Sequence, residues 1–452
     1  MVTDTTIRAY IGDFIKMNKL KLQQLAELTG LNAGTISGIV NGNRPIAISQ
    51  IDALTEAMEL PKGHFYEQYA HEFFVEYEPH WRRIEPFLLR CAELNKLDLI
   101  RKVVYGVTEK RVYLTDLFEL AEQIRANGMG SAALIIYQCI AEGEKYQYSE
   151  RLALCQYRIF LLSQGLEQKE NLRLASVFEQ YVDRLDEEDQ LDGIKDLMNT
   201  YAACSQYDKW YESTFKLENK SKMVRRFLKN KNDYKSVYPP FVYEAYAYLV
   251  RGGYYDKVGD YDKALSCAKH YYDLTLFDNP TDEELVHVRK LRKWSHMNTL
   301  LYKVLQGDET KVCEYLEAIP DEDKELCIAL LNIFQAANKY DYDTDFVMEQ
   351  YRQTIDRLFS KSLSTTHLFY NIDKVTFFYE LAHYQLRKDR FDEGMKFLLK
   401  SFEDSICIRD ELRTLKCVDL FGEYRNHATV QQMEEYKRLF QTVCERKKYG
   451  TN

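Results

Sequence analysis

One short stretch near the start of the chain, residues 23–44, is rich in side chains that make directional hydrogen bonds. They comprise amides, hydroxyls and one guanidinium group. Amides and hydroxyls both donate and accept hydrogen bonds, whereas a guanidinium only donates and favours carboxylate or phosphate. This is the chemistry of recognition and not of bond cleavage. The residues are Gln23, Gln24, Asn32, Thr35, Ser37, Asn41, Asn43 and Arg44.

Signatures of catalysis or cofactor binding are missing from the sequence. It contains no G-x-G-x-x-G, no G-x-x-x-x-G-K-[ST] and no H-E-x-x-H. The nine histidines form no metal-type cluster with the cysteines. His64 and His71 could share a helix face, but one such pair is more often structural. We therefore predict no catalytic residue, no metal, no cofactor and no enzyme activity.

Four amphipathic helices must position the hydrogen-bonding residues. Apolar residues at helical spacing predict helices near residues 7–15, 22–29, 32–40 and 48–58. A tight turn separates the second helix from the third, and an asparagine there is a good N-cap. A helix-turn-helix also needs a small residue at the helix crossing and branched apolar residues on its second helix. The residues at these offsets are Ala26, Gly30, Leu31, Ile36 and Ile39.

This pattern closely resembles the phage-repressor (XRE) helix-turn-helix family over residues 4–66. Residues 25–31, 35–39 and 41–45 carry the resemblance. It implies that the third helix lies in the major groove of double-stranded DNA. It also implies base-edge or phosphate contacts from Asn32, Thr35, Ser37 and Asn41, backbone contacts from Gln23 and Gln24, and phosphate contacts from Asn43 and Arg44. The alternative is an ordinary four-helix cap that binds nothing.

The charge of this segment departs from the usual DNA-binding pattern. None of its basic residues falls in the third helix. Residues 1–66 contain six bases (Arg8, Lys16, Lys19, Lys21, Arg44, Lys62) and six acids (Asp4, Asp13, Glu27, Asp52, Glu56, Glu59), and six minus six leaves no net positive charge. Because phosphate neutralisation supplies much of the affinity for DNA, a single copy should bind weakly. A homodimer that reads two half-sites would correct this weakness.

The composition is that of a long helical chain. The 452 residues include 19 Gly and 8 Pro, which is about half the usual share of helix breakers. The net charge of −9 argues against a protein that coats polyanions. No apolar run of roughly 18 residues predicts a membrane span, and the first residues lack a secretory pattern. The ten scattered cysteines predict a reducing, cytoplasmic location, and we expect no membrane partner.

The rest of the chain predicts a helical repeat array. Residues 117–137, 194–210, 248–271 and 378–398 fit, to varying degrees, a paired-helix frame of about 34 residues. These segments resemble degenerate tetratricopeptide repeats, and the alternative is a non-repeating helical bundle. The predicted organisation is a DNA-binding domain at 1–66, a linker helix and the start of the array at 67–110, the repeat domain at 111–428, and a capping helix at 429–452.

Domain order, length and repeat type resemble the cytoplasmic peptide-pheromone receptors of Gram-positive bacteria and their phages. This class includes the Rgg, NprR, PlcR and PrgX regulators, the Rap proteins and the arbitrium receptors. The resemblance implies an all-α fold, with a repressor-type helix-turn-helix domain followed by a tetratricopeptide-like right-handed α-superhelix. The superhelix of this class binds a short peptide and dimerises.

A groove that binds an extended peptide must satisfy the peptide's backbone N–H and C=O groups, and asparagine side chains can satisfy both. In the repeat frame, the candidate peptide contacts are Asn199, Tyr246, Asn298, Asn332 and His383. The sequence therefore predicts a transcription regulator of the quorum-sensing type, controlled by an imported signalling peptide. The alternatives are a Rap-like scaffold that docks a response regulator or another partner, and a repressor-type regulator with a non-peptide ligand.

Overall fold

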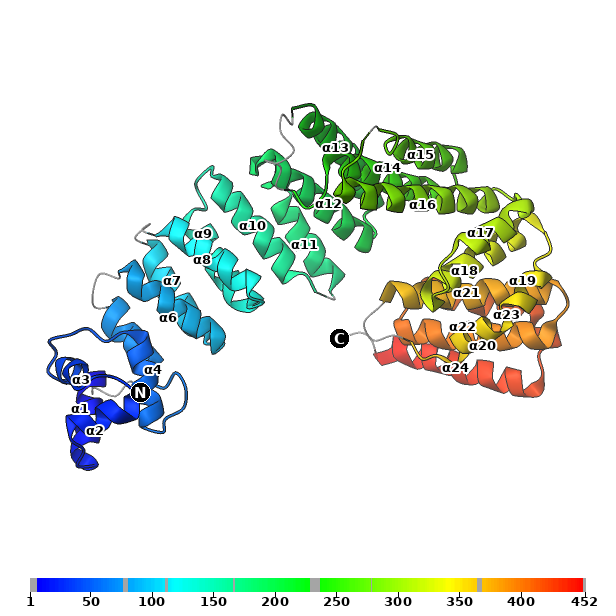
Figure 1. The fold of residues 1–452 in the computed structure, drawn as a ribbon. Coiled ribbons are helices and arrows are strands. Elements are labelled where there is room, and N and C mark those ends of the chain that lie inside the picture. Colours follow the sequence, from blue (N-terminus) through cyan, green and yellow to red (C-terminus); the bar gives the residue numbers. More distant parts are fainter. Residues whose placement is uncertain are drawn as a thin grey trace. The chain divides into compact units, whose positions relative to one another are not determined.

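The computed structural model describes residues 6–75, 80–109, 113–165, 167–227, 236–277, 279–363 and 368–449 (Figure 1). Every regular element in these ranges is a helix and none is a strand, which confirms the predicted all-helical class. No helix in the described ranges is both long enough and apolar enough to cross a membrane. Contacts divide the chain into two compact units, residues 1–237 and residues 238–452.

Unit 1 begins with four short helices that pack around a shared apolar centre. They are α1 (Ile7–Met17), α2 (Leu22–Thr29), α3 (Ala33–Val40) and α4 (Ile48–Ala57). Local sequence explains their ends. The Thr6 hydroxyl caps α1 by accepting the Ala9 N–H at 3.2 Å, and Gly30 ends α2 in the left-handed region with φ of 68°. Their buried apolar residues include Ile7, Ile11, Leu25, Ile36, Ile39, Ile51 and Leu54.

An aromatic segment joins these four helices to the rest of unit 1. α5 (Tyr66–Ala70) continues into a π-helical turn (His71–Val75), followed by α6 (Trp81–Glu93) and α7 (Leu97–Glu109). The rings of Tyr66 and Tyr69 each lie 5.5 Å from the Phe87 ring, measured between centroids. One cluster of buried apolar side chains runs from Ile7 to Cys155, so the core of α1–α4 is continuous with that of the following helices.

Six further helices lie in sequence order in unit 1, and each packs against the next (Figure 1). They are α8 (Leu114–Ala126), α9 (Gly130–Gly143), α10 (Glu150–Ser163), α11 (Gln168–Phe178), α12 (Glu187–Ala203) and α13 (Tyr207–Phe227). The acidic run 186–189 begins α12, where Asp186 accepts the Glu188 and Asp189 N–H groups. Negative charge at this end is favourable because it faces the positive end of the helix dipole.

Unit 2 contains α14 (Pro240–Lys257), α15 (Tyr261–Asp273), α16 (Asp282–Leu305), α17 (Val312–Ala318), α18 (Asp323–Tyr340), α19 (Asp345–Gln350), α20 (Arg352–Ser360), α21 (Leu368–Arg387), α22 (Phe391–Ile408), α23 (Glu411–Tyr424) and α24 (Val430–Tyr449). α14, α16, α18 and α21 form a series in which each helix contacts the next, and α15, α17 and α22 pack against members of it. Gly394 permits close packing of α22 on α21, because a Cβ there would lie 2.6 Å from Cγ of Leu386. The division between Val237 and Tyr238 falls inside the predicted repeat domain.

Candidate functional site

The turn between α2 and α3 brings the hydrogen-bonding residues of 23–44 close together. Asn32 begins α3 by accepting the Thr35 N–H at 2.7 Å. Gln24 accepts the Lys21 N–H at 2.8 Å at the start of α2. Both side chains therefore cap a helix with their carbonyl oxygen, which leaves the NH₂ group of each available at the surface.

Exposure separates the predicted DNA-contact residues into three groups. Ser37 is half-buried, and its hydroxyl accepts a hydrogen bond from Nδ2 of Asn41 at 3.2 Å. Thr35 is buried, with 5% of its surface exposed. Its hydroxyl therefore faces the protein and not the solvent. The exposed members are Gln23, Gln24, Asn32, Asn41, Asn43 and Arg44.

Thr35 belongs to a small network that holds Arg44 against α3. Nη1 of Arg44 donates to Oγ1 of Thr35 at 3.3 Å, and the Arg44 N–H donates to the Gly38 carbonyl at 3.0 Å. Gly38 leaves room for this arrangement, because a Cβ there would already lie 3.3 Å from the Arg44 Cβ. Thr35 thus orients the Arg44 guanidinium.

Arg8 on α1 is a second cation at this surface, and the sequence reasoning missed its role. Its Nη2 donates to the Arg44 carbonyl at 3.3 Å. Within the described ranges neither guanidinium has a carboxylate partner, and Nε of Arg8 is buried with no hydrogen-bond partner. Two cations without counter-ions attract an anion such as phosphate. No sequence signal marks Arg8, because it meets Arg44 across 36 residues.

One acid in this segment is neutralised by a residue outside it. Asp52 on α4 accepts Nε of Arg90 on α6 at 2.8 Å and the Tyr66 hydroxyl at 2.7 Å. Burial, together with this hydrogen bond, raises the pKa of Tyr66, which remains a donor. In the full segment 1–66, six bases then face five acids other than Asp52, so six minus five leaves one net positive charge, against none when Asp52 is counted as free.

Further contacts attach α1–α4 to the aromatic segment. The Ile7 N–H donates to Oε1 of Glu72 at 2.8 Å, and the Tyr69 hydroxyl donates to the Ile46 carbonyl at 3.0 Å. Tyr69 is buried, with 1% of its surface exposed, so its hydrogen bond is shielded from water. The surface around α3 is therefore joined firmly to α5 and the helices that pack on it.

The residues predicted to contact a peptide fall in both units. Asn199 is exposed on α12 in unit 1. The other four lie in unit 2, one on each helix of the series α14, α16, α18 and α21, and all are half-buried: Tyr246, Asn298, Asn332 and His383. The structure thus brings four of the five predicted residues onto neighbouring helices of one unit.

Two of these asparagines already use one amide donor inside unit 2. Nδ2 of Asn298 donates to the Tyr271 hydroxyl at 3.1 Å, and Nδ2 of Asn332 donates to the Tyr315 hydroxyl at 3.4 Å. Both tyrosines are buried. Each asparagine therefore retains its carbonyl oxygen and one N–H for a ligand. The prediction from the sequence assumed that the whole amide group was available.

A carboxylic acid close to these tyrosines was also missed by the sequence reasoning. Burial raises the pKa of Asp256, near the end of α14, to about 6. Burial is also the main cause that raises the pKa of Tyr302 and that of Tyr315, the latter to about 12, and the charge of Asp256 adds to both shifts. A carboxyl group in such surroundings favours its protonated form. Asp256 is therefore more easily protonated than an ordinary aspartate.

In the described ranges, no group of three or more His, Cys, Asp or Glu side chains is arranged to hold a metal ion. The His64 ring instead packs against Phe65, with centroids 4.8 Å apart, and lies 6.2 Å from the Tyr10 ring.

No protein-family model matches the chain, and no curated protein matches it. Function is therefore inferred from the sites themselves.

Proposed function

We propose that this chain is a DNA-binding transcription regulator, controlled by a short signalling peptide that binds in its helical array. The observation that carries the proposal is the α2–turn–α3 arrangement with Arg8 and Arg44 beside α3. In it, exposed amide side chains adjoin two guanidinium groups that have no carboxylate partner among the described residues. As in repressor-type helix-turn-helix domains, α3 would enter the major groove while the arginines contact phosphate.

Within this proposal the polar residues have different tasks. Asn41 and Ser37 are the candidates for base edges, because an asparagine amide can pair with adenine and a hydroxyl can bond to any base. Gln23, Asn32 and Asn43 remain candidates for further contacts with DNA. Thr35 acts as a positioning residue for Arg44, to which it is bonded at 3.3 Å.

A homodimer is part of the proposal because the basic surface is small. Few phosphates can be neutralised by one copy, so the affinity of a single copy should be modest. A dimer would read a palindrome whose half-sites lie about one helical turn, roughly 34 Å, or a multiple of it apart. We place this dimer in the cytoplasm, in keeping with the cysteine usage and with the receptor class that the sequence resembles.

Peptide control is supported by the connection between α1–α4 and the following helices. Because α1–α4 share one apolar core with the helices as far as α10, a rearrangement of α6–α10 would also displace α3. The peptide must bind one arrangement better than the other, since equal affinity for both would shift nothing. The four residues of unit 2 named above are one set of candidate contacts for this peptide.

The proposal is tested by selection of DNA from a random-sequence pool with the full-length chain. We expect a palindromic sequence to be enriched. Arg8→Ala and Arg44→Ala should each weaken binding about equally for all sequences and lower the salt slope by about one. Arg173→Ala, which removes an exposed arginine paired with Glu170, is the matched control. A pool that yields no preferred sequence would reject the proposal and favour a protein-docking scaffold.

A further inference from the structure

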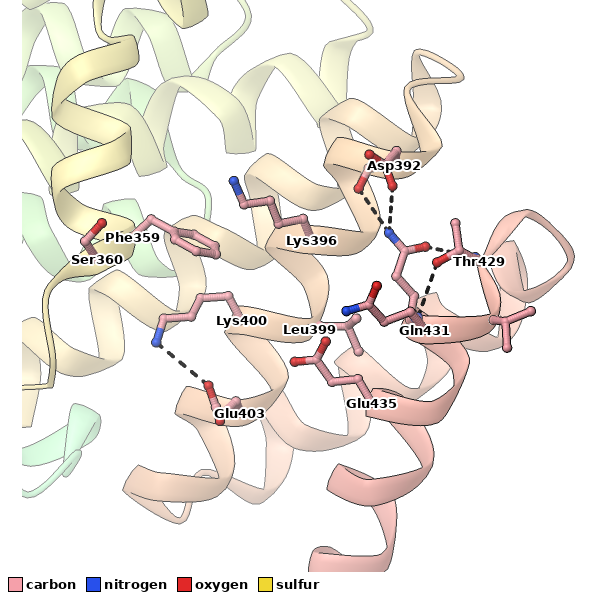
Figure 2. A pocket seen from close by; sticks show the side chains of 12 residues that line it. Phe359, Ser360, Asp392, Lys396, Leu399, Lys400, Glu403, Thr429, Gln431 and Glu435 are labelled. Atoms are coloured by element: carbon pink, nitrogen blue, oxygen red, sulfur yellow. Dashed lines mark hydrogen bonds and ion pairs between the residues drawn. The ribbon is translucent and has the colours of Figure 1, made fainter.

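An open groove lies in unit 2 between α22, the start of α24 and the end of α20 (Figure 2). Its volume is about 840 Å³, within the range of roughly 300–1,000 Å³ that ligand pockets occupy. Its lining residues on α22 run from Asp392 to Glu403 at helical spacing. At about 1.5 Å per residue this stripe is about 16 Å long, which matches about five residues of an extended chain.

The two sides of the groove differ in charge. Figure 2 shows Lys396 and Lys400 extending from α22 toward the end of α20, and Gln431 and Glu435 extending from α24 toward α22. Nζ of Lys396 lies 4.7 Å from the centroid of the Phe359 ring, a favourable position for a cation. The side formed by α20 and α22 therefore carries two cations and an aromatic ring together with the Asp392 and Glu403 carboxylates, and the α24 side carries an amide and a carboxylate.

Some polar groups in the groove already have partners within unit 2. Lys400 forms an ion pair with Asp404 at 3.0 Å. Nε2 of Gln432 donates to the Asp392 carboxylate at 3.0 Å. These groups are held in place by the protein and shape the groove.

Lys396 and Glu435 differ from these paired groups. Neither has an ion-pair partner among the residues that the structure describes, and the Gln431 amide makes no hydrogen bond there. One unpaired cation, one unpaired anion and one unused amide therefore face the same groove. A ligand that carries both charges and a peptide backbone would satisfy all three.

We propose that this groove is the binding site of the signalling peptide, which binds as a free chain of about five residues, the length that the groove admits. The terminal carboxylate pairs with Lys396, the terminal ammonium pairs with Glu435, and Gln431 bonds to the backbone between them. A short free peptide carries these two charges at neutral pH, whereas an internal segment of a protein does not. The α14–α21 series is the weaker candidate, because its asparagines already use a donor inside the array. This inference rests on the proposed peptide control.

The first experiment is affinity selection with the full-length chain. A pool of synthetic pentapeptides with free termini is incubated with the protein, the complex is isolated by gel filtration, and retained peptides are identified by mass spectrometry. A second pool has the same sequences with acetylated and amidated termini. We expect retention from the free pool only. Equal retention from the blocked pool would overturn the assignment of the terminal charges.

The second experiment is calorimetry with a retained peptide. Lys396→Glu and Glu435→Lys should each weaken binding about fivefold, because each replaces an attraction to a peptide terminus by a repulsion. Lys437→Glu is the matched control, since Lys437 is exposed on α24 and does not line the groove. If Asn298→Ala and Asn332→Ala abolish peptide binding while both charge reversals leave it unchanged, the peptide binds on the α14–α21 series and not in the groove.

Failure of this inference is distinguishable from failure of the proposed function. If the chain selects a DNA sequence but retains no peptide, then peptide control and the peptide-binding groove are both rejected, while DNA recognition stands. If peptides bind at the groove but no DNA sequence is selected, the peptide-binding site stands and the proposal of a transcription regulator fails.

Discussion

Replacement of Asp52 by alanine should loosen the four N-terminal helices from the rest of unit 1. Asp52 accepts the Tyr66 hydroxyl at 2.7 Å and Nε of Arg90 at 2.8 Å. Tyr66 is completely buried, and a buried donor that loses its acceptor costs about 1–3 kcal/mol. The ion pair is partly exposed, 36% for Arg90 and 24% for Asp52, so it adds only ~0–1 kcal/mol. The expected loss is about 2–3 kcal/mol, or roughly 30–150-fold in the local opening equilibrium.

Hydrogen exchange followed by mass spectrometry measures this loss where it occurs. A chain with two compact units is not expected to unfold in one step, so local opening is the better readout. We expect amides of α1, α4 and α5 in Asp52→Ala to exchange faster by that factor, while α14–α24 remain unchanged. Tyr66→Phe removes the donor and keeps the ion pair, so its effect should be only about 1 kcal/mol.

The matched control for Asp52→Ala is Glu170→Ala on α11. It also deletes the carboxylate of an ion pair with arginine, but the partners there are 62% and 44% exposed, so exchange should not change. If Asp52→Ala behaved like Glu170→Ala, the attachment of the four helices would not depend on Asp52, and the reasoning from its two hydrogen bonds would be refuted.

Three further predictions test other parts of the molecule. Gly394→Ala would place a Cβ 2.6 Å from Cγ of Leu386, so thermal unfolding should show a loss of stability of about 1–3 kcal/mol. Gly422→Ala is the control, because nothing lies within 4 Å of the Cβ that it adds, and it should cause no loss of stability. Asp256→Asn should stabilise the protein at pH 8 by on the order of 3 kcal/mol and give little gain at pH 4. The pKa of Asp256 in the folded chain, about 6, is above its ordinary value of 3.8, so the stability of the wild type falls as pH rises from 3.8 to 6. An equal gain at pH 4 and pH 8 would contradict the raised pKa of Asp256. Ser37→Ala and Asn41→Ala should each reduce discrimination between the selected DNA and random DNA by ~1–3 kcal/mol in binding isotherms. Arg44→Ala should instead weaken binding to the selected DNA and to random DNA alike. If all three substitutions weakened binding to the two DNAs equally, Ser37 and Asn41 would not be base contacts.

The sequence alone predicts features whose physics is local. Helices expected at 7–15, 22–29, 32–40 and 48–58 are found as Ile7–Met17, Leu22–Thr29, Ala33–Val40 and Ile48–Ala57. Gly30 ends a helix in the left-handed region, and Asn32 caps the next one. These features depend on residues within one helical turn of each other, so composition and spacing are sufficient to predict them.

Pairing and burial depend on residues that are distant in the sequence, and only the tertiary structure decided them. Helical periodicity places Thr35 on the outer side of its helix, but Arg44 folds back and bonds to it, and Thr35 is buried. Asp52 counts as a free acid in the sequence, yet Arg90, 38 residues later, neutralises it. The same holds for the groove of unit 2, whose lining residues come from α20, α22 and α24. The packing of these helices decides whether a charge in the groove is paired or left for a ligand. The hydrophobic pattern of a helix determines which of its faces is buried, but not which other helix covers that face.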